Sequence, residues 1–128
     1  MKYKLERGIH GLCSITALLL LLPLNSLATA VEEGASLFVT YCESCHGVDG
    51  DGNGSAAAEF VLKPRDFALA AFKFDTDADW QRGTDDDLAS VIKEGAAAFG
   101  GSNLMPGWDH LSKDEVEKLI AYIRSLQQ

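Results

Sequence analysis

The apolar positions of this chain recur at helical spacing in two segments that lie far apart. The segment 32–44 carries Leu37, Phe38 and Tyr41 on one side, which predicts a first helix. The segment 112–126 predicts a last helix, with an apolar stripe formed by Val116, Leu119, Ile120, Ile123 and Leu126. No segment alternates apolar and polar residues convincingly enough to predict a strand. The sequence therefore indicates an all-α fold.

Two helix starts are marked by capping residues. Thr84 offers a hydroxyl cap and is followed by three aspartates, which favour the positive end of a helix dipole. The helix that begins there is predicted to end at Gly95, because glycine is common just past a helix end. Ser112 and Glu115 have the spacing of a capping box, which marks the start of the last helix.

The remaining segments are predicted to be mostly loops. Four glycines within residues 47–54 end the first helix. A short helix is predicted over residues 55–62, ended by Pro64. Residues 65–83 are irregular, and four aromatic side chains in them are spaced for burial in a wrapping loop: Phe67, Phe72, Phe74 and Trp80.

Residues 1–30 have the three-part layout of a secretory signal peptide. A basic start is followed by an apolar run, and a small-residue pattern ends at Ala30. The apolar run is shorter than the roughly 20 residues needed to span a bilayer. We expect cleavage after Ala30, export to the periplasm and no stable membrane insertion afterwards; an uncleaved anchor is the alternative. Residues 31–128 then form a single domain.

The acidic composition restricts the partners. The chain has 128 residues, with 19 acidic and 11 basic side chains and a net charge of −8. Loss of residues 1–30 removes three basic side chains and one acidic one, which brings the net charge to −10. Nucleic acid is excluded as a partner because phosphate binding needs a basic face. We expect partner proteins with a basic docking face.

The most informative motif is Cys42-Glu43-Ser44-Cys45-His46. Two thiols three positions apart at a helix end can reach the two vinyl groups of one haem, and His46 then points at the iron. Three other interpretations are weaker. A redox-active dithiol would need a βαβ context, and a zinc site would need two more ligands. A plain disulfide would leave His46 without a role.

The iron needs a sixth ligand or an open position. Apart from the initiator, Met105 is the chain's only methionine, and it lies in a glycine-rich loop between two predicted helices. A lone methionine in a polar loop is unusual as a core filler. Met105 is therefore the predicted second axial ligand. His110 and an open iron site are the alternatives.

These motifs, in this order, resemble a class I monohaem cytochrome c of the small bacterial periplasmic kind. The resemblance covers about residues 34–126 and implies three to five helices with long loops wrapped around one covalent haem c. It also implies a tight crossing of the first and last helices at Gly34, Phe38 and Tyr122. Residues 67–83 are longer than in the shortest family members, and their purpose does not follow from the sequence.

The resemblance implies further site residues. A backbone carbonyl, expected at Pro64, would hold the second nitrogen of His46, and Arg65 would pair with a haem propionate. The haem edge is expected near residues 96–100, where a small apolar surface would dock partners.

The resemblance also implies the function. We expect a monomeric one-electron carrier that cycles haem iron between Fe(II) and Fe(III), with no enzymatic activity. The alternative is a haem c subunit of a respiratory or periplasmic oxidoreductase complex, and a less favoured one is an open-site haem sensor or enzyme.

Two acidic patterns at residues 49–54 and 75–79 are similar to parts of calcium loops. Both lack the closing glutamate at the required position, so calcium binding is not expected.

Overall fold

The computed structural model describes residues 23–128, and within these it contains helices, turns and loops without a strand. Most of the predicted signal peptide lies outside the described residues. The elements in chain order are α1 (Pro23–Tyr41), α2 (Glu43–His46), the 3₁₀ helix η1 (Ser55–Ala57), α3 (Asp85–Glu94), the 3₁₀ helix η2 (Ala96–Phe99) and α4 (Lys113–Ser125). The all-α prediction is confirmed. No helix in the described part of the chain is long and apolar enough to cross a membrane.

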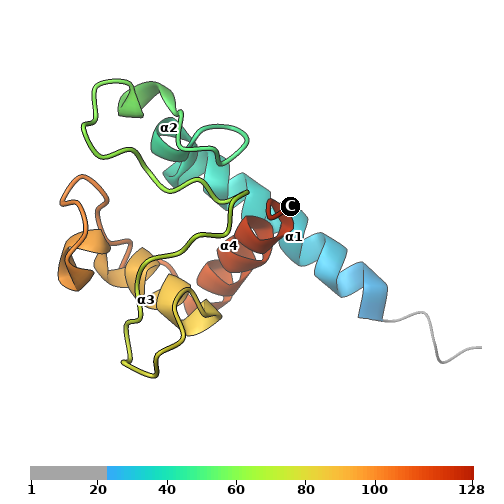
Figure 1. Cartoon of the computed structure of the whole chain (residues 1–128). Coiled ribbons are helices and arrows are strands. Elements are labelled where there is room, and N and C mark those ends of the chain that lie inside the picture. The colour runs from blue at the N-terminus through green and yellow to red at the C-terminus, as the bar shows by residue number, and fades with distance from the viewer. Residues whose placement is uncertain (1–22) are drawn as a thin grey trace, which may run out of the picture.

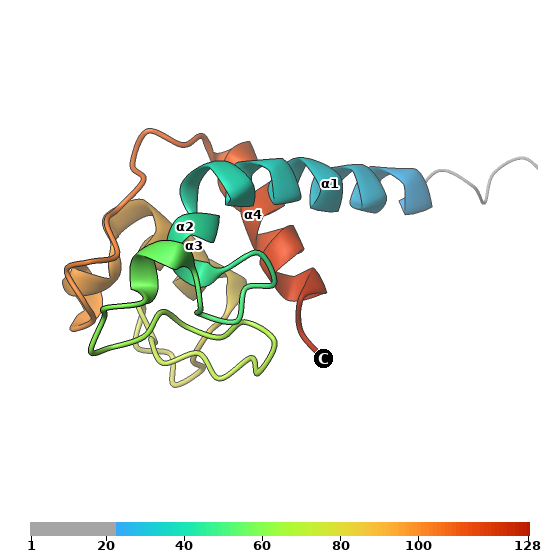
Figure 2. The same ribbon diagram turned by 90° about the horizontal axis from the view of Figure 1, so that it is seen from above.

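The first and last helices cross and form one side of the domain. Figures 1 and 2 show α4 crossing α1, while the N-terminal half of α1 extends away from the rest of the fold. At the crossing, a Cβ atom on Gly34 would lie 2.0 Å from the backbone oxygen of Lys118, so only glycine allows this approach. The Phe38 side chain is 1% exposed, and its ring centre lies 5.1 Å from that of Tyr122. The predicted crossing is therefore confirmed.

Helix α3 packs against α4 and begins where the sequence predicts. The Thr84 hydroxyl accepts a hydrogen bond from the backbone N–H of Asp87, and the Asp87 carboxylate accepts one from the N–H of Thr84. Arg124 of α4 donates to the Asp85 carboxylate and to the carbonyl of Gly83. These bonds fix the start of α3 against the end of α4.

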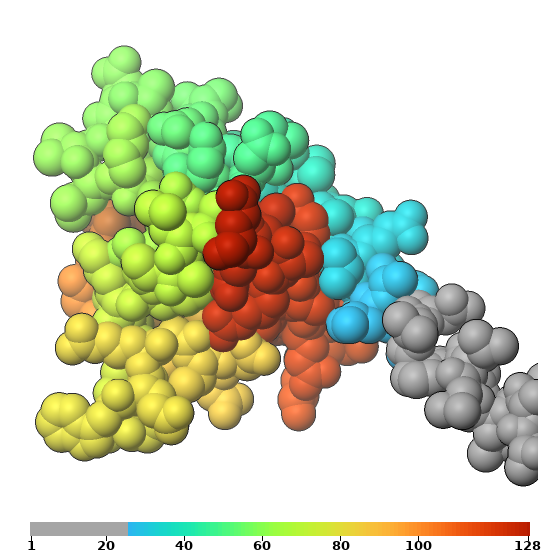
Figure 3. All heavy atoms as spheres, turned by 45° about the vertical axis from the view of Figure 1, so that its right-hand side comes forward, coloured from blue at the N-terminus to red at the C-terminus, as the bar shows by residue number. Residues whose placement is uncertain are grey.

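The core lies between these helices and the long loop that precedes α3. Figure 3 shows α4 between the N-terminal helix on one side and the loop segments on the other. The buried apolar side chains form one cluster, made up of Phe38, Phe67, Leu88, Ile92, Leu111, Val116, Leu119, Ile120 and Ile123. One surface of this cluster faces the cavity described below.

The predicted elements differ from the structure in three places. The first helix begins earlier, at Pro23, and ends at Tyr41, with α2 following as a separate turn. The predicted helix at residues 55–62 is reduced to the single turn η1. Trp80 is 93% exposed, so its predicted burial is wrong.

Candidate cofactor site

The cysteine motif lies where the first helix turns. Cys42 caps α2, and its N–H still donates to the carbonyl of Phe38 at 2.8 Å. The N–H groups of Cys45 and His46 both donate to the carbonyl of Cys42, at 3.1 and 2.8 Å. One tight turn at the end of a long helix therefore carries the two thiols and the imidazole.

His46 is buried and held from two sides. Its Nδ1 lies 3.2 Å from the carbonyl oxygen of Arg65, and since a carbonyl can only accept, Nδ1 carries the proton. The Phe67 ring stacks on the imidazole with centres 4.5 Å apart and planes 14° from parallel. Burial lowers the pKa of His46, while the bond to Arg65 acts in the opposite direction. A neutral ring with a protonated Nδ1 leaves Nε2 free to bind a metal.

The carbonyl that holds His46 corrects one prediction. The family resemblance implied that Pro64 offers this carbonyl, but the structure assigns it to Arg65, one residue further along the chain. The Pro64 carbonyl instead lies against Gly52, where a Cβ atom would come within 2.5 Å of its oxygen. Pro64 therefore shapes the glycine-rich loop below His46.

Neither thiol of the motif takes part in a disulfide, and the Cys42 thiol is unreactive. Both Cys42 and Cys45 are half-buried and unbridged. Burial, and then the neighbouring Cys45, raise the pKa of Cys42 to about 12. Redox-active dithiols have lowered pKa values, because the thiolate is the nucleophile. This environment argues against a thioredoxin-like function.

A cavity with largely apolar walls opens beside this turn. About 640 Å³ of space that no atom fills lies between these walls, and part of it is open to solvent. Cys42, His46, Arg65 and Met105 all line it. Cys45 does not line it, although it belongs to the same turn. The apolar walls come from Phe67, Phe72, Phe74, Leu88, Val91, Ile92 and Ile123.

Met105 reaches the cavity from a loop that is tied to α3. Its carbonyl accepts a hydrogen bond from the N–H of Ala96 at 3.2 Å, and the N–H of Trp108 donates to the carbonyl of Ile92 at 2.8 Å. Gly95, at φ +83°, allows the close approach, since a Cβ atom there would lie 2.9 Å from the Met105 oxygen. The loop that carries Met105 is therefore held against α3 by backbone hydrogen bonds.

His110, the alternative ligand, is placed elsewhere. Its ring is exposed and lies 5.7 Å from the ring of Tyr41 and 6.0 Å from that of Trp108. It is not among the residues that line the cavity. The geometry therefore favours Met105 over His110.

The insertion at residues 67–83, unexplained by the sequence, forms one wall of this cavity. It contributes Phe67, Phe72, Lys73, Phe74 and Gly83. Sequence reasoning expected the aromatic residues to be buried but did not place them at the site. It also missed Lys73 entirely.

The predicted docking surface at residues 96–100 is only partly exposed. Ala97 and Ala98 face solvent, but Ala96 is buried and Phe99 is half-buried. The prediction that Ala96 belongs to this surface is wrong, because Ala96 is buried in the core beneath η2.

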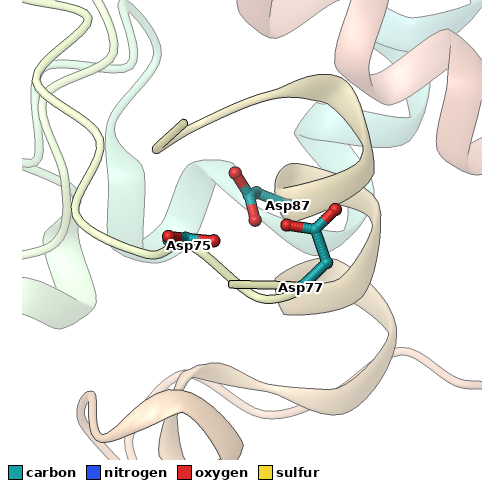
Figure 4. A group of neighbouring side chains, drawn as sticks. All are labelled: Asp75, Asp77 and Asp87. Atoms are coloured by element: carbon teal, nitrogen blue, oxygen red, sulfur yellow. The ribbon is translucent and has the colours of Figure 1, made fainter. Parts of the chain in front are cut away.

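The acidic loop before α3 brings three carboxylates together. Among residues 23–128, Asp75, Asp77 and Asp87 are the one group of three or more metal-ligand side chains whose atoms lie within 4.8 Å of one another (Figure 4). The Asp87 carboxylate already accepts four hydrogen bonds, two from Thr76 and two from Thr84. The lone pairs of the Asp87 carboxylate are therefore occupied. Neither Cys42 nor Cys45 belongs to such a group in the described residues, which argues against a zinc site at the cysteine turn.

The donor set fits a covalently attached haem. Two thiols at the Cys-x-x-Cys-His spacing, an imidazole with a free Nε2 and a thioether are the groups that hold haem c. The imidazole and the thioether line one apolar cavity, which a macrocycle needs.

Comparisons with known proteins agree with this fit. The profile of the family described as cytochrome C oxidase, cbb3-type, subunit III matches residues 29–123. The chain is also similar to a chain in the reducing HAO-like protein complex of Kuenenia stuttgartiensis, with 32% sequence identity and a TM-score of 0.62. That similarity covers 75% of this chain and 42% of the other. This chain thus spans less than half of the chain that it resembles.

Proposed function

We propose a function from the premise that this chain belongs to the cytochrome c oxidase, cbb3-type, subunit III family. It is a c-type cytochrome, which carries haem c covalently and transfers electrons. Within that role, we propose a periplasmic one-electron carrier with a single haem, His46 and Met105 as axial ligands, and no enzymatic activity. The observation that carries this proposal is that His46 and Met105 line the same apolar cavity.

Each residue of the site has a distinct task. Haem c bound in the cavity supplies reversible one-electron transfer at its iron. Cys42 and Cys45 provide the thiols for covalent attachment. His46 offers Nε2 to the iron, while the Arg65 carbonyl fixes the orientation of its ring.

The other side of the cavity supplies a sulfur ligand and apolar walls. Met105 offers a thioether, which favours the reduced iron more than a second imidazole would. The walls of phenylalanine and aliphatic side chains exclude water, which further favours the less charged state. With His46 and Met105 both bound to the iron, no position would be left for a substrate.

Carbon monoxide binding tests the ligand assignment. The dithionite-reduced holoprotein should keep its low-spin visible spectrum when the gas is added, because Met105 holds the sixth position. Met105→Ala should form a carbon monoxide adduct promptly. Leu104→Ala is the matched control, since Leu104 is the preceding loop residue and is 52% exposed. A prompt adduct in the unmodified protein would refute the carrier proposal and favour a sensor or an enzyme.

The number of haems and the compartment can be measured on the same protein. A haem-to-protein ratio of one is expected, with loss of covalent attachment when Cys42 and Cys45 are both replaced by alanine. Fractionation of the host should place the holoprotein in the periplasm, with a mature N-terminus at Val31.

A subunit role is the second candidate, and the similarity to a chain of a multi-protein complex favours it. Redox partners are expected in either case. For the free carrier we propose a monomer that docks through its acidic surface on basic partner faces, so association should weaken as salt rises. Co-purification with a stable partner at high salt would favour the subunit role.

A further inference from the structure

Asp87 is a carboxylate in the wall of the cofactor cavity. It is the third residue of α3 and is only 1% exposed. It lines the same cavity as His46 and Met105. Acidic side chains are seldom buried to this degree without a cation beside them.

All the partners of this carboxylate are neutral. One oxygen accepts from the N–H and the hydroxyl of Thr76, and the other accepts from the N–H and the hydroxyl of Thr84. In the part of the chain that the structure describes, no lysine, arginine or histidine forms an ion pair with it. The nearby Arg124 pairs with Asp85 instead.

These hydrogen bonds keep the group ionised. Burial by itself would raise the pKa of Asp87, but the four bonds from Thr76 and Thr84 outweigh it and lower the pKa to about 2. The carboxylate is therefore ionised at neutral pH.

Capping of α3 does not require this burial. Glu115 plays the same capping role at the start of α4, where Ser112 donates to its carboxylate at the surface. Asp87 differs because its carboxylate also binds Thr76 of the cavity-lining insertion and because Asp87 is itself one of the residues that line the cavity.

We propose that Asp87 is a fixed negative charge that lowers the reduction potential of the haem in this cavity. This inference rests on the proposed cofactor site. Ferric haem carries one more positive charge than ferrous haem, so a neighbouring anion stabilises the ferric state. In a site of low dielectric constant such a charge is poorly screened.

Other charged side chains around the cavity also affect the reduction potential. Arg65 and Lys73 also line it, and both act in the opposite direction. Lys73 is exposed, so solvent screens it more strongly than it screens Asp87. The carboxylates of Asp75 and Asp77 lie within 4.8 Å of that of Asp87 and act in the same direction as it does, and both accept bonds from the N–H of Asp79.

The test is a spectroelectrochemical titration of the holoprotein and its Asp87→Asn variant. Asparagine has nearly the same shape but lacks the charge, so the potential should rise. For charges about 10 Å apart at an effective dielectric constant of about 20, the equilibrium between reduced and oxidised protein shifts roughly tenfold. A tenfold shift corresponds to about 59 mV for one electron.

The sign of the shift separates charge from packing. A loosened cavity would admit water and lower the potential, whereas loss of the charge raises it. Asp79→Asn is the matched control, because Asp79 is an exposed acid of the same loop and should leave the potential unchanged. A low-spin Asp87→Asn protein whose potential is unchanged or lower would overturn the proposal.

A second variant covers the case in which Asp87→Asn does not fold. Asp87→Ser also removes the charge but keeps a hydroxyl that can bond at the start of α3, so the potential should rise; a fall or no change would overturn the proposal. These titrations report a charge, while carbon monoxide binding reports the axial ligands, so the two proposals fail independently.

Discussion

Replacement of Gly34 by alanine tests whether the crossing of α1 and α4 is set by backbone contact. The new Cβ atom would lie 2.0 Å from the Lys118 carbonyl oxygen, and ordinary contact begins at 3.4 Å. The helices must therefore separate locally by about 1.4 Å. The obstacle is backbone, so no side-chain rotation relieves it.

The cost follows from what the separation disrupts. The rings of Phe38 and Tyr122 pack directly beside the crossing, and a gap of this size loses much of their dispersion attraction. Overpacking of this kind costs up to about 3 kcal/mol, while alanine gains about 1 kcal/mol in helix propensity. We expect a net loss of about 2 kcal/mol in the free energy of unfolding.

Urea unfolding of the holoprotein, followed by far-ultraviolet circular dichroism, measures this loss. The midpoint should fall with little change in slope. Ser36→Ala is the control, because Ser36 lies on the exposed side of the same helix and its substitution should be nearly neutral. A Gly34→Ala protein as stable as the unmodified one, or more stable, would show that the crossing tolerates a side chain.

Two further predictions concern the cavity wall. The pKa of Asp87 is lowered from 3.8 to about 2, so the ionised carboxylate stabilises the fold above pH 4 and this stabilisation is lost as the pH falls towards 2. Over that range, the free energy of unfolding of the unmodified protein should fall by about 2 kcal/mol more than that of Asp87→Asn. Parallel curves for the two proteins would contradict this prediction. Phe67→Leu removes the ring that stacks on His46 and should lower the free energy of unfolding, measured in urea, by about 1 kcal/mol. Phe60 is half-buried and does not stack on His46, so Phe60→Leu should lower it by less. Equal losses in the two variants would argue against a contribution from stacking.

Local signals in the sequence were sufficient for much of the fold. The starts of α3 and α4 could be predicted because Thr84 with Asp87, and Ser112 with Glu115, bond within four residues of each other. Gly34 could be placed at the crossing only through the family resemblance. Its partner, the Lys118 carbonyl, is distant in sequence.

The predictions that the structure contradicts concern residues whose positions depend on the path of the long loops. Whether Pro64 or Arg65 offers its carbonyl to His46 depends on how the glycine-rich loop turns beneath the imidazole. The exposure of Trp80 follows from the hydrogen bonds that fold the acidic loop outwards, including one from its own N–H to Asp75. The capping role of Asp87 is local, but its place in the cavity wall depends on tertiary packing.

The crossing of the first and last helices also constrains the order of events during biosynthesis. Gly34 and Lys118 touch, although more than 80 residues separate them along the chain. The core therefore cannot close until α4 has been made, and a partial chain has no partner for the buried side of α1. Such a late closure of the core is compatible with the export to the periplasm that we propose.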